Sequence, residues 1–198
     1  DKGECTESFA CQDCEYVQRP NIGQPSLFPD AVLFDDMIDL DPCCDIRISK
    51  ITVFSDLEIV GIEVTYYVNG NMEVRRHGSE SDDWITTSIE LEEQEYIKKV
   101  GVAGTFAIEA LEIITSLDNY IYAGFSSSEF SYLDIPGGFG VSAFRGHFSS
   151  AGLVSLGALI PASSDAQCQC GYELLFNKTC DSECNTAVCN FDNGACNQ

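Results

Sequence analysis

The cysteines are the residues of this sequence with the clearest capacity for chemistry. The chain has 11 of them in 198 residues, and they gather near its two ends. Thiols this dense in short segments are typical of disulfide frameworks, so we expect a secreted protein of an oxidising, extracellular compartment. The odd number leaves one thiol that is free, paired with another chain, or paired with a precursor segment. The expected disulfide residues are Cys5, Cys11, Cys14, Cys43, Cys44, Cys168, Cys170, Cys180, Cys184, Cys189 and Cys196.

A reduced metal-thiolate protein is the alternative interpretation of these cysteines. Zinc sites are commonly built from paired Cys-x-x-Cys knuckles, and only Cys11 and Cys14 form one here. We therefore favour disulfides over zinc.

General acid–base or nucleophilic catalysis has few candidate residues. His77 and His147 are the two histidines, and neither stands in a serine, cysteine or carboxylate signature of known spacing. The HExxH, GxSxG and P-loop motifs are absent from the sequence. The sequence therefore predicts a protein that is not an enzyme.

Two groups of acidic residues carry a possible metal chemistry. Clustered carboxylate oxygens are the ligands that Ca²⁺ prefers. A solvated acidic surface explains the same pattern and is the interpretation we favour. The groups are Asp35, Asp36, Asp39 and Asp41, and Glu80, Asp82 and Asp83.

The acidic excess restricts the partners of the protein. With 32 acidic and 10 basic side chains, the formal net charge is -22. Nucleic acids and anionic membrane surfaces are bound by basic patches, so we expect neither as a partner. No run reaches the roughly 18 to 20 apolar residues of a membrane-spanning helix, so we expect no membrane insertion.

The middle of the chain has the residue pattern of β-strands. Between Asp45 and Ile160, apolar residues alternate with a period of two, and β-branched and aromatic residues are frequent. Turn signals such as Asn69-Gly70 and Asp118-Asn119 recur at short intervals. Many short strands joined by tight turns predict an all-β sandwich, barrel or prism.

Residues 89–100 fit either a helix or a strand. Glu95 stands four residues before Lys99, which is a helix-supporting charge pair. The segment also has the pattern of a polar-faced strand beside a turn, and its neighbours are predicted strands. We therefore predict a strand here, followed by a turn at Gly101–Gly104.

Composition divides the chain into four segments. Residues 1–30 are polar and contain several prolines, which predicts a disulfide-pinned arm without a core of its own. Residues 31–161 carry the strand pattern and form the main domain. Residues 162–167 have the composition of a linker. Residues 168–198 hold six cysteines and predict a small module stabilised by disulfides.

Several blocks of the strand region resemble the jacalin-type lectin domain. They are LFDDMIDLD at residues 33–41, IRISKITVFSDLEIVGIEVTYYVNGN at 46–71, EYIKKVGVAGTFAIEALEIITSLDNYIYAGF at 95–125 and FGVSAFRGHFSSAGLVSLGALI at 139–160. The resemblance implies a β-prism of three four-stranded antiparallel sheets. Their hydrophobic faces would meet along the prism axis, which suits the observed alternation.

Two departures from this family affect the sugar site that the resemblance implies. Sugar-binding members have an early Gly-Gly loop where this chain has SLFPDAV, and a ligand aspartate near the last strand where this chain has Val154. A carboxylate accepts hydrogen bonds from vicinal sugar hydroxyls, and valine accepts none. A sugar would therefore bind elsewhere, and the candidate contacts are Trp84, Gly146, His147 and Gly152.

The C-terminal cysteines resemble a Notch-type cysteine repeat. Residues 180–196 have its C-x3-C-x4-C-x6-C spacing, and the resemblance implies one Ca²⁺ with oxygen ligands that include Asn185 and Asp192. Ala195 stands where the second aspartate of the family would be, which weakens the calcium site. An EGF-like module is the structural alternative. An N-glycosylation sequon begins at Asn177 and predicts a glycoprotein.

Two functions are compatible with these features. The leading hypothesis is a secreted interaction or assembly protein, such as an adhesive-matrix or filament subunit, which binds other copies of itself or extracellular matrix proteins. The odd cysteine and the depleted sugar site favour it. The alternative is a carbohydrate-binding lectin with a displaced or degenerate sugar site and glycans as partners.

Overall fold

The computed structural model describes residues 16–38, 40, 46–68, 70–79, 83–135 and 140–161. All 11 cysteines, Asn177, Asn185 and Asp192 lie outside these residues. The disulfide framework, the linker, the Notch-type repeat and its calcium site therefore stay predictions.

Thirteen β-strands and one short 3-10 helix make up the described part of the chain. The strands are β1 (Tyr16–Gln18), β2 (Ile22–Gly23), β3 (Val32–Asp35), β4 (Ile46–Ser55), β5 (Ile59–Val68), β6 (Asn71–Gly78), β7 (Ile85–Glu90), β8 (Ile97–Ala103), β9 (Ala110–Thr115), β10 (Tyr120–Gly124), β11 (Ser131–Tyr132), β12 (Ala143–Ser149) and β13 (Gly152–Pro161). The 3-10 helix η1 (Pro25–Leu27) lies between β2 and β3.

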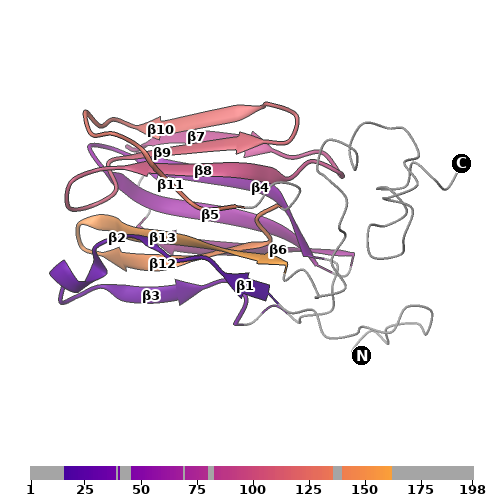
Figure 1. Ribbon diagram of the computed structural model, residues 1–198, viewed down its shortest axis with the longest axis horizontal. Helices are drawn as coiled ribbons and strands as arrows, with labels where there is room; N and C mark the ends of the chain where they lie inside the picture. The colour runs from indigo at the N-terminus through magenta and orange to yellow at the C-terminus, as the bar shows by residue number, and fades with distance from the viewer. Residues whose placement is uncertain are drawn as a thin grey trace, which may run out of the picture.

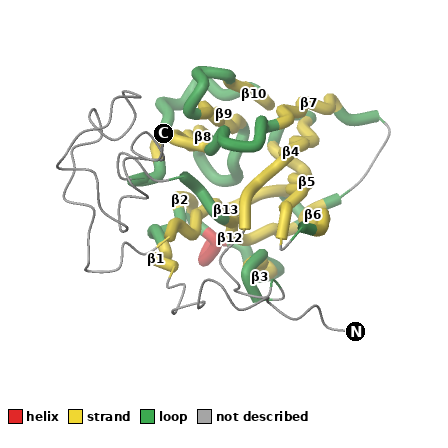
Figure 2. Tube along the Cα trace, turned by 90° about the vertical axis from the view of Figure 1, so that its right-hand side faces the viewer, coloured by secondary structure: helices red, strands yellow, loops and turns green. Residues whose placement is uncertain are grey.

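The strands form three antiparallel sheets (Figure 1). Sheet A has the order β1-β13-β12-β3, with β2 also paired to β13; sheet B has the order β6-β5-β4-β7, and sheet C the order β10-β9-β8-β11. Figure 2, a view along the long axis, shows the sheets as three sides around a common interior. The all-β class and the three-sheet architecture are confirmed, although sheet A has five strands rather than the predicted four.

Sheet A begins earlier in the chain than residue 31. β1 and β2 fall within the segment predicted as an arm, and both pair with β13. The Arg19 N–H donates to the Ala158 carbonyl at 2.9 Å, which extends this pairing. Strands of two and three residues are too short to show alternation, so the sequence pattern does not reveal them.

The segment at residues 89–100 is two strand ends joined by a turn. β7 ends at Glu90 and β8 begins at Ile97, so the preference for strand over helix is correct. Gly101, predicted to lie in a turn, is inside β8, and the chain leaves the strand after Ala103.

The apolar residues at alternating strand positions fill the interior between the sheets. Sheet B contributes Ile51, Val53, Ile62 and Val64, all fully buried. Burial of one such side chain contributes about 1.5–3 kcal/mol, so this shared core is the main source of stability. The corresponding buried residues of sheets A and C include Phe144, Leu153, Leu156, Ile97, Leu111 and Ile113.

Two backbone hydrogen bonds join all three sheets at one end of the prism. The Ile59 N–H of β5 donates to the Ile108 carbonyl at 2.8 Å, and the Ile108 N–H donates to the Leu153 carbonyl of β13 at 2.7 Å. Gly152 packs against the same point, because a Cβ there would lie 2.5 Å from the Ile59 carbonyl oxygen. The connection after β8 thus bridges sheets A and B.

Asp36 ties sheets A and B together in the interior. Its buried carboxylate accepts a hydrogen bond from the Tyr66 hydroxyl and contacts Nε2 of His77. The Phe144 N–H donates to the Tyr66 hydroxyl oxygen at 3.2 Å, and the Asp36 N–H donates to the Phe144 carbonyl at 3.1 Å. Burial, followed by the neighbouring Asp36 carboxylate, raises the pKa of Tyr66 well above its ordinary value. The phenol therefore stays neutral and serves as a fixed donor.

Removal of the Tyr66 hydroxyl is expected to destabilise the protein. Tyr66→Phe leaves the Oδ2 atom of Asp36 without its donor and the Phe144 N–H without its acceptor, while His77 still contacts Oδ1. An unpaired buried polar group costs about 1–3 kcal/mol. Urea unfolding measures the loss, with Tyr67→Phe on the outward side of β5 as the control. The control should change the free energy of unfolding by less than about 0.5 kcal/mol. Equal stabilities of the two variants would contradict the role of this network.

Candidate functional site

Several connections of the chain meet at one end of the prism, which we call the loop end. They join β2 to β3, β4 to β5, β8 to β9, and β12 to β13, and they lie on the left in Figure 1. Loops held by a rigid scaffold are the common location of binding residues. The loop end is therefore a candidate location for a ligand-binding site.

The structure brings only part of the predicted sugar-contact set to the loop end. Gly152 lies in the β12–β13 hairpin, and Trp84 directly precedes β7, whose first residue pairs with the last residue of β4. Gly146 and His147 lie inside β12, in the body of sheet A. The four residues therefore do not line one common site.

The surroundings of Gly146 and His147 give both residues a role in packing. A Cβ on Gly146 would lie 2.2 Å from the Ser155 carbonyl oxygen and 2.8 Å from the Phe34 ring. His147 Nδ1 lies 2.9 Å from Ser155 Oγ, and Ser155 is fully buried. This serine and histidine therefore hold two strands together and do not present a nucleophile to a substrate.

Val154 stands where the resemblance implies a ligand aspartate, and the structure buries it completely. Its carbonyl accepts a hydrogen bond from the Gln24 N–H at 3.1 Å. Gly23 has a φ of +120°, and a Cβ there would lie 2.2 Å from the same carbonyl oxygen. The strand β2 therefore packs closely on this position, and the buried valine offers a sugar no carboxylate here.

Asp30, in the connection between β2 and β3, places a carboxylate at the loop end. The Ser150 N–H in the β12–β13 hairpin donates to Asp30 Oδ2 at 2.8 Å. The Ser150 side chain, and then its N–H, lower the pKa of Asp30, so the exposed carboxylate stays ionised in mild acid. Asp30 lies within the SLFPDAV stretch that lacks glycine. The sequence pattern does not reveal Asp30 as a site residue, because its partner Ser150 is 120 residues away in the chain.

Apolar side chains project from three of the connections at the loop end. Leu57, Phe106 and Phe125 are 76%, 67% and 76% exposed. The Phe125 N–H donates to the Glu109 carbonyl at 3.0 Å, which places this loop beside the connection after β8. Exposed aromatic rings are common in sugar sites, because the ring stacks on the apolar face of a pyranose.

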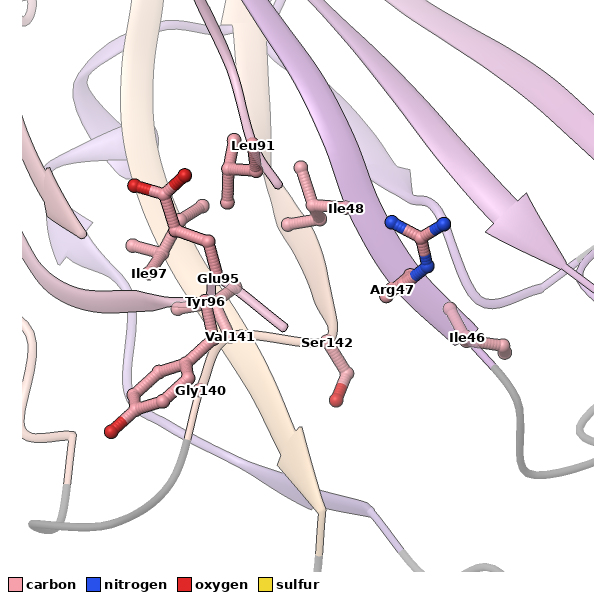
Figure 3. Close-up of a pocket in the computed structure, with 10 residues that line it drawn as sticks. All are labelled: Ile46, Arg47, Ile48, Leu91, Glu95, Tyr96, Ile97, Gly140, Val141 and Ser142. Carbon is pink, nitrogen blue, oxygen red and sulfur yellow. The ribbon is translucent and has the colours of Figure 1, made fainter. Parts of the chain in front are cut away.

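A hollow of about 180 Å³ opens at the other end of the prism (Figure 3). Aliphatic side chains such as Leu91, Ile48 and Val141 line its middle, and the charged ends of Glu95 and Arg47 point away from each other. Because polar groups do not converge in it, the hollow is a poor candidate for a polar ligand. Its lining residues are Ile46, Arg47, Ile48, Leu91, Glu95, Tyr96, Ile97, Gly140, Val141 and Ser142.

Glu95, at the edge of this hollow, has its carboxylate held by internal donors. It accepts hydrogen bonds from the Thr115 hydroxyl, from Asn119 Nδ2 at 2.9 Å and from the Glu92 N–H at 3.0 Å. Burial raises the pKa of Glu95, but these hydrogen bonds together lower it further, so the pKa lies below its ordinary value. Glu95 therefore fixes the turn between β7 and β8.

The described residues hold no group of three or more His, Cys, Asp or Glu side chains that could bind a metal ion. Asp35 lies 3.9 Å from Arg145, and Asp36 points into the interior, so these two members of the acidic group have internal partners. Within the same part of the chain, no helix has the length and apolar character of a membrane span.

Comparison with known proteins assigns the family. The model of the Jacalin-like lectin domain matches residues 35–159, which is more than half of the chain. This protein therefore belongs to the Jacalin-like lectin domain family, as the residue blocks of the sequence predict. The comparison with curated proteins gave no match.

Solved structures of lectins share the fold. The mannose-specific jacalin-related lectin from Morus nigra, in complex with mannose, is 18% identical with a TM-score of 0.61, covering 78% of this chain and 99% of that one. The mannose-binding jacalin-related lectin from Ananas comosus is 19% identical with a TM-score of 0.58, covering 74% and 97%. Frutapin, a lectin from Artocarpus incisa, is 18% identical with a TM-score of 0.60, covering 75% and 99%.

The low pKa of Glu95 predicts a pH-dependent contribution to stability. Because the folded-state pKa lies below the unfolded value, the contribution is present above about pH 5 and is lost as the pH falls through the folded-state pKa. Glu95→Gln should therefore be about 1–3 kcal/mol less stable at pH 7, and the difference should shrink below about pH 4. Urea unfolding from pH 3 to 7 measures it. A difference that does not change with pH would contradict this interpretation.

Proposed function

We propose that this protein is a carbohydrate-binding lectin whose sugar site lies at the loop end, beside Asp30. The observation that carries the proposal is the Asp30 carboxylate at the junction of the first loop and the last hairpin, 2.8 Å from the Ser150 nitrogen. Membership of the Jacalin-like lectin domain family supports it. The proposed site lies in the region that the resemblance implies for the sugar. Its carboxylate comes from Asp30 instead of from position 154.

The Asp30 carboxylate can accept hydrogen bonds from a sugar while it holds the hairpin. A carboxylate has about four acceptor positions, and the N–H and hydroxyl of Ser150 use part of them. Asp30 is exposed, so the remaining positions face solvent. Hydrogen bonds from sugar hydroxyls to an ionised carboxylate are stronger than those to a neutral acceptor. Phe106 and Phe125 offer rings for the apolar side of the same ligand.

The proposed ligand is a neutral hexose of the mannose type. The similar lectins from Morus nigra and Ananas comosus are described as mannose-specific and mannose-binding. Anionic sugars are disfavoured, because the chain has a formal net charge of -22. The sugar would be bound and released without chemical change. The density of cysteines in the sequence further supports a secreted protein that meets glycans outside the cell.

The family favours the lectin over the assembly function that the sequence first suggests. The assembly hypothesis depends on an unpaired cysteine, and every cysteine lies outside the described residues. Self-association through disulfides therefore stays a prediction of its own.

Asp30→Asn is expected to weaken sugar binding about 10-fold. The amide can still accept from Ser150, so the loop stays in place, but the charge that strengthens hydrogen bonds to the sugar is lost. Isothermal titration with mannose, after a glycan array has ranked the ligands, measures the dissociation constant. The matched control is Asp56→Asn, an exposed residue in the β4–β5 turn of the same end, which should change affinity less than about twofold.

Two outcomes would count against the proposed function. Equal losses in the Asp30 and Asp56 variants would indicate a general charge effect rather than contact with the sugar. No retention on any neutral glycan at millimolar concentration, together with disulfide-linked species on non-reducing electrophoresis, would support the assembly hypothesis instead.

A further inference from the structure

The outer face of sheet C carries a row of aromatic rings that the loop-end site does not use. Tyr122 of β10 and Tyr132 of β11 lie in one row across the sheet, and Glu112 and Gly101 lie between them in the same row. The Phe130 ring lies between the two tyrosines, with its centroid 5.9 Å from that of Tyr122 and 6.1 Å from that of Tyr132. Three rings therefore form one continuous surface.

Gly101 allows the rings to lie directly on the backbone of β8. A Cβ at this position would be 2.5 Å from the Tyr132 ring and 2.9 Å from the Phe130 ring. The Tyr132 and Phe130 rings thus pack on the backbone at Gly101. The side chains of Tyr122 and Tyr132 remain 43% and 44% exposed. A glycine inside a strand often marks a close approach of this kind.

Lys99 and Glu112 form an incomplete ion pair at the edge of the rings. Lys99 Nζ lies 3.8 Å above the Tyr132 ring centroid and 3.8 Å from Glu112 Oε2. Glu112 Oε2 is buried and has no hydrogen-bond partner. A hydroxyl oxygen that hydrogen-bonds to both groups needs a wider separation than 3.8 Å, so the ammonium must move away from Glu112 to admit one. The Lys99 side chain is 42% exposed, so its ammonium can shift to admit that oxygen.

We propose that this surface, the aromatic platform of Tyr122, Phe130, Tyr132, Lys99 and Glu112, is a second carbohydrate-binding site. A neutral pyranose stacks its C–H face on the rings, with the Lys99 ammonium moved from its position over Tyr132. One of its hydroxyls donates to Glu112 and accepts from Lys99. The inference rests on the proposed lectin function for the class of ligand, but it uses a different face of the prism.

The charges of the platform favour a neutral sugar over other occupants. A cationic ligand would be repelled by the Lys99 ammonium, which lies over the Tyr132 ring. An anion, including a nucleic acid, meets Glu112 and a chain with a formal net charge of -22. A hydroxyl group both donates and accepts, so it satisfies the carboxylate and the ammonium together.

Two backbone amides report the two sites separately. The Gly101 amide lies beneath the platform rings, and the Ser150 amide donates to Asp30 at the loop end. We expect titration of the full chain with mannose, followed by ¹H–¹⁵N NMR, to shift both signals with independent dissociation constants. Asp30→Asn should weaken the Ser150 response and leave the Gly101 response within about twofold.

Tyr132→Ala provides the matched test of the platform. Loss of one stacking ring should weaken the Gly101 response roughly 10-fold and leave the Ser150 response unchanged, which also shows that the variant is folded. Tyr132→Phe keeps the ring and should retain binding within about twofold.

The outcomes separate this inference from the proposed function. A Ser150 shift without a Gly101 shift would overturn the platform and leave the loop-end site. A Gly101 shift alone would support the platform and reject the loop-end site. Neither shift would reject both, and a Gly101 signal that moves with protein concentration but not with mannose would show that the platform is instead an interface between copies of the chain.

Discussion

The pair of backbone hydrogen bonds that runs from Ile59 through Ile108 to Leu153 is the constraint on which the rest of the structure depends. It fixes three sheets from distant parts of the sequence around one apolar interior. Each partner is a buried residue, so an opened bond would leave an amide or carbonyl without water, at a cost of about 1–3 kcal/mol. The closed prism brings the β2–β3 connection, the β8–β9 connection and the β12–β13 hairpin to one end.

Because the prism is closed, the polar groups that stabilise the fold lie in its interior, and the groups available for binding lie on its surface. The buried polar groups of Asp36 and Glu95 are satisfied by internal donors and hold strands and turns in place. The carboxylate of Asp30 and the rings of sheet C lie at the surface, on elements that the core keeps rigid. Val154, which stands where the resemblance implies a ligand aspartate, is a buried part of this scaffold. The carboxylate that we propose for the sugar is Asp30, which accepts from the Ser150 N–H.

The fold could be predicted from the sequence where burial on one face imposes a period of two, as in β4 and β5. The short strands β1 and β2 could not, because they are held by pairing with β13 rather than by a pattern of their own. Asp30 could not be assigned because its partner, Ser150, is 120 residues away. Glycine is a common turn residue, so the sequence alone suggests a turn at Gly101. Only the pairing of β8 with β9 and β11 shows that the Tyr132 and Phe130 rings pack on it.

Native-state hydrogen exchange at the amides of Ile59 and Ile108 tests the closure most directly. Both amides should exchange only through global unfolding, with a free energy equal to that from denaturant unfolding and unchanged when the cysteines are reduced. Exchange of either amide through local opening, as rapid as that of the exposed Phe106, would contradict a prism closed by its own core. The same contradiction would follow if reduction of the cysteines removed the protection.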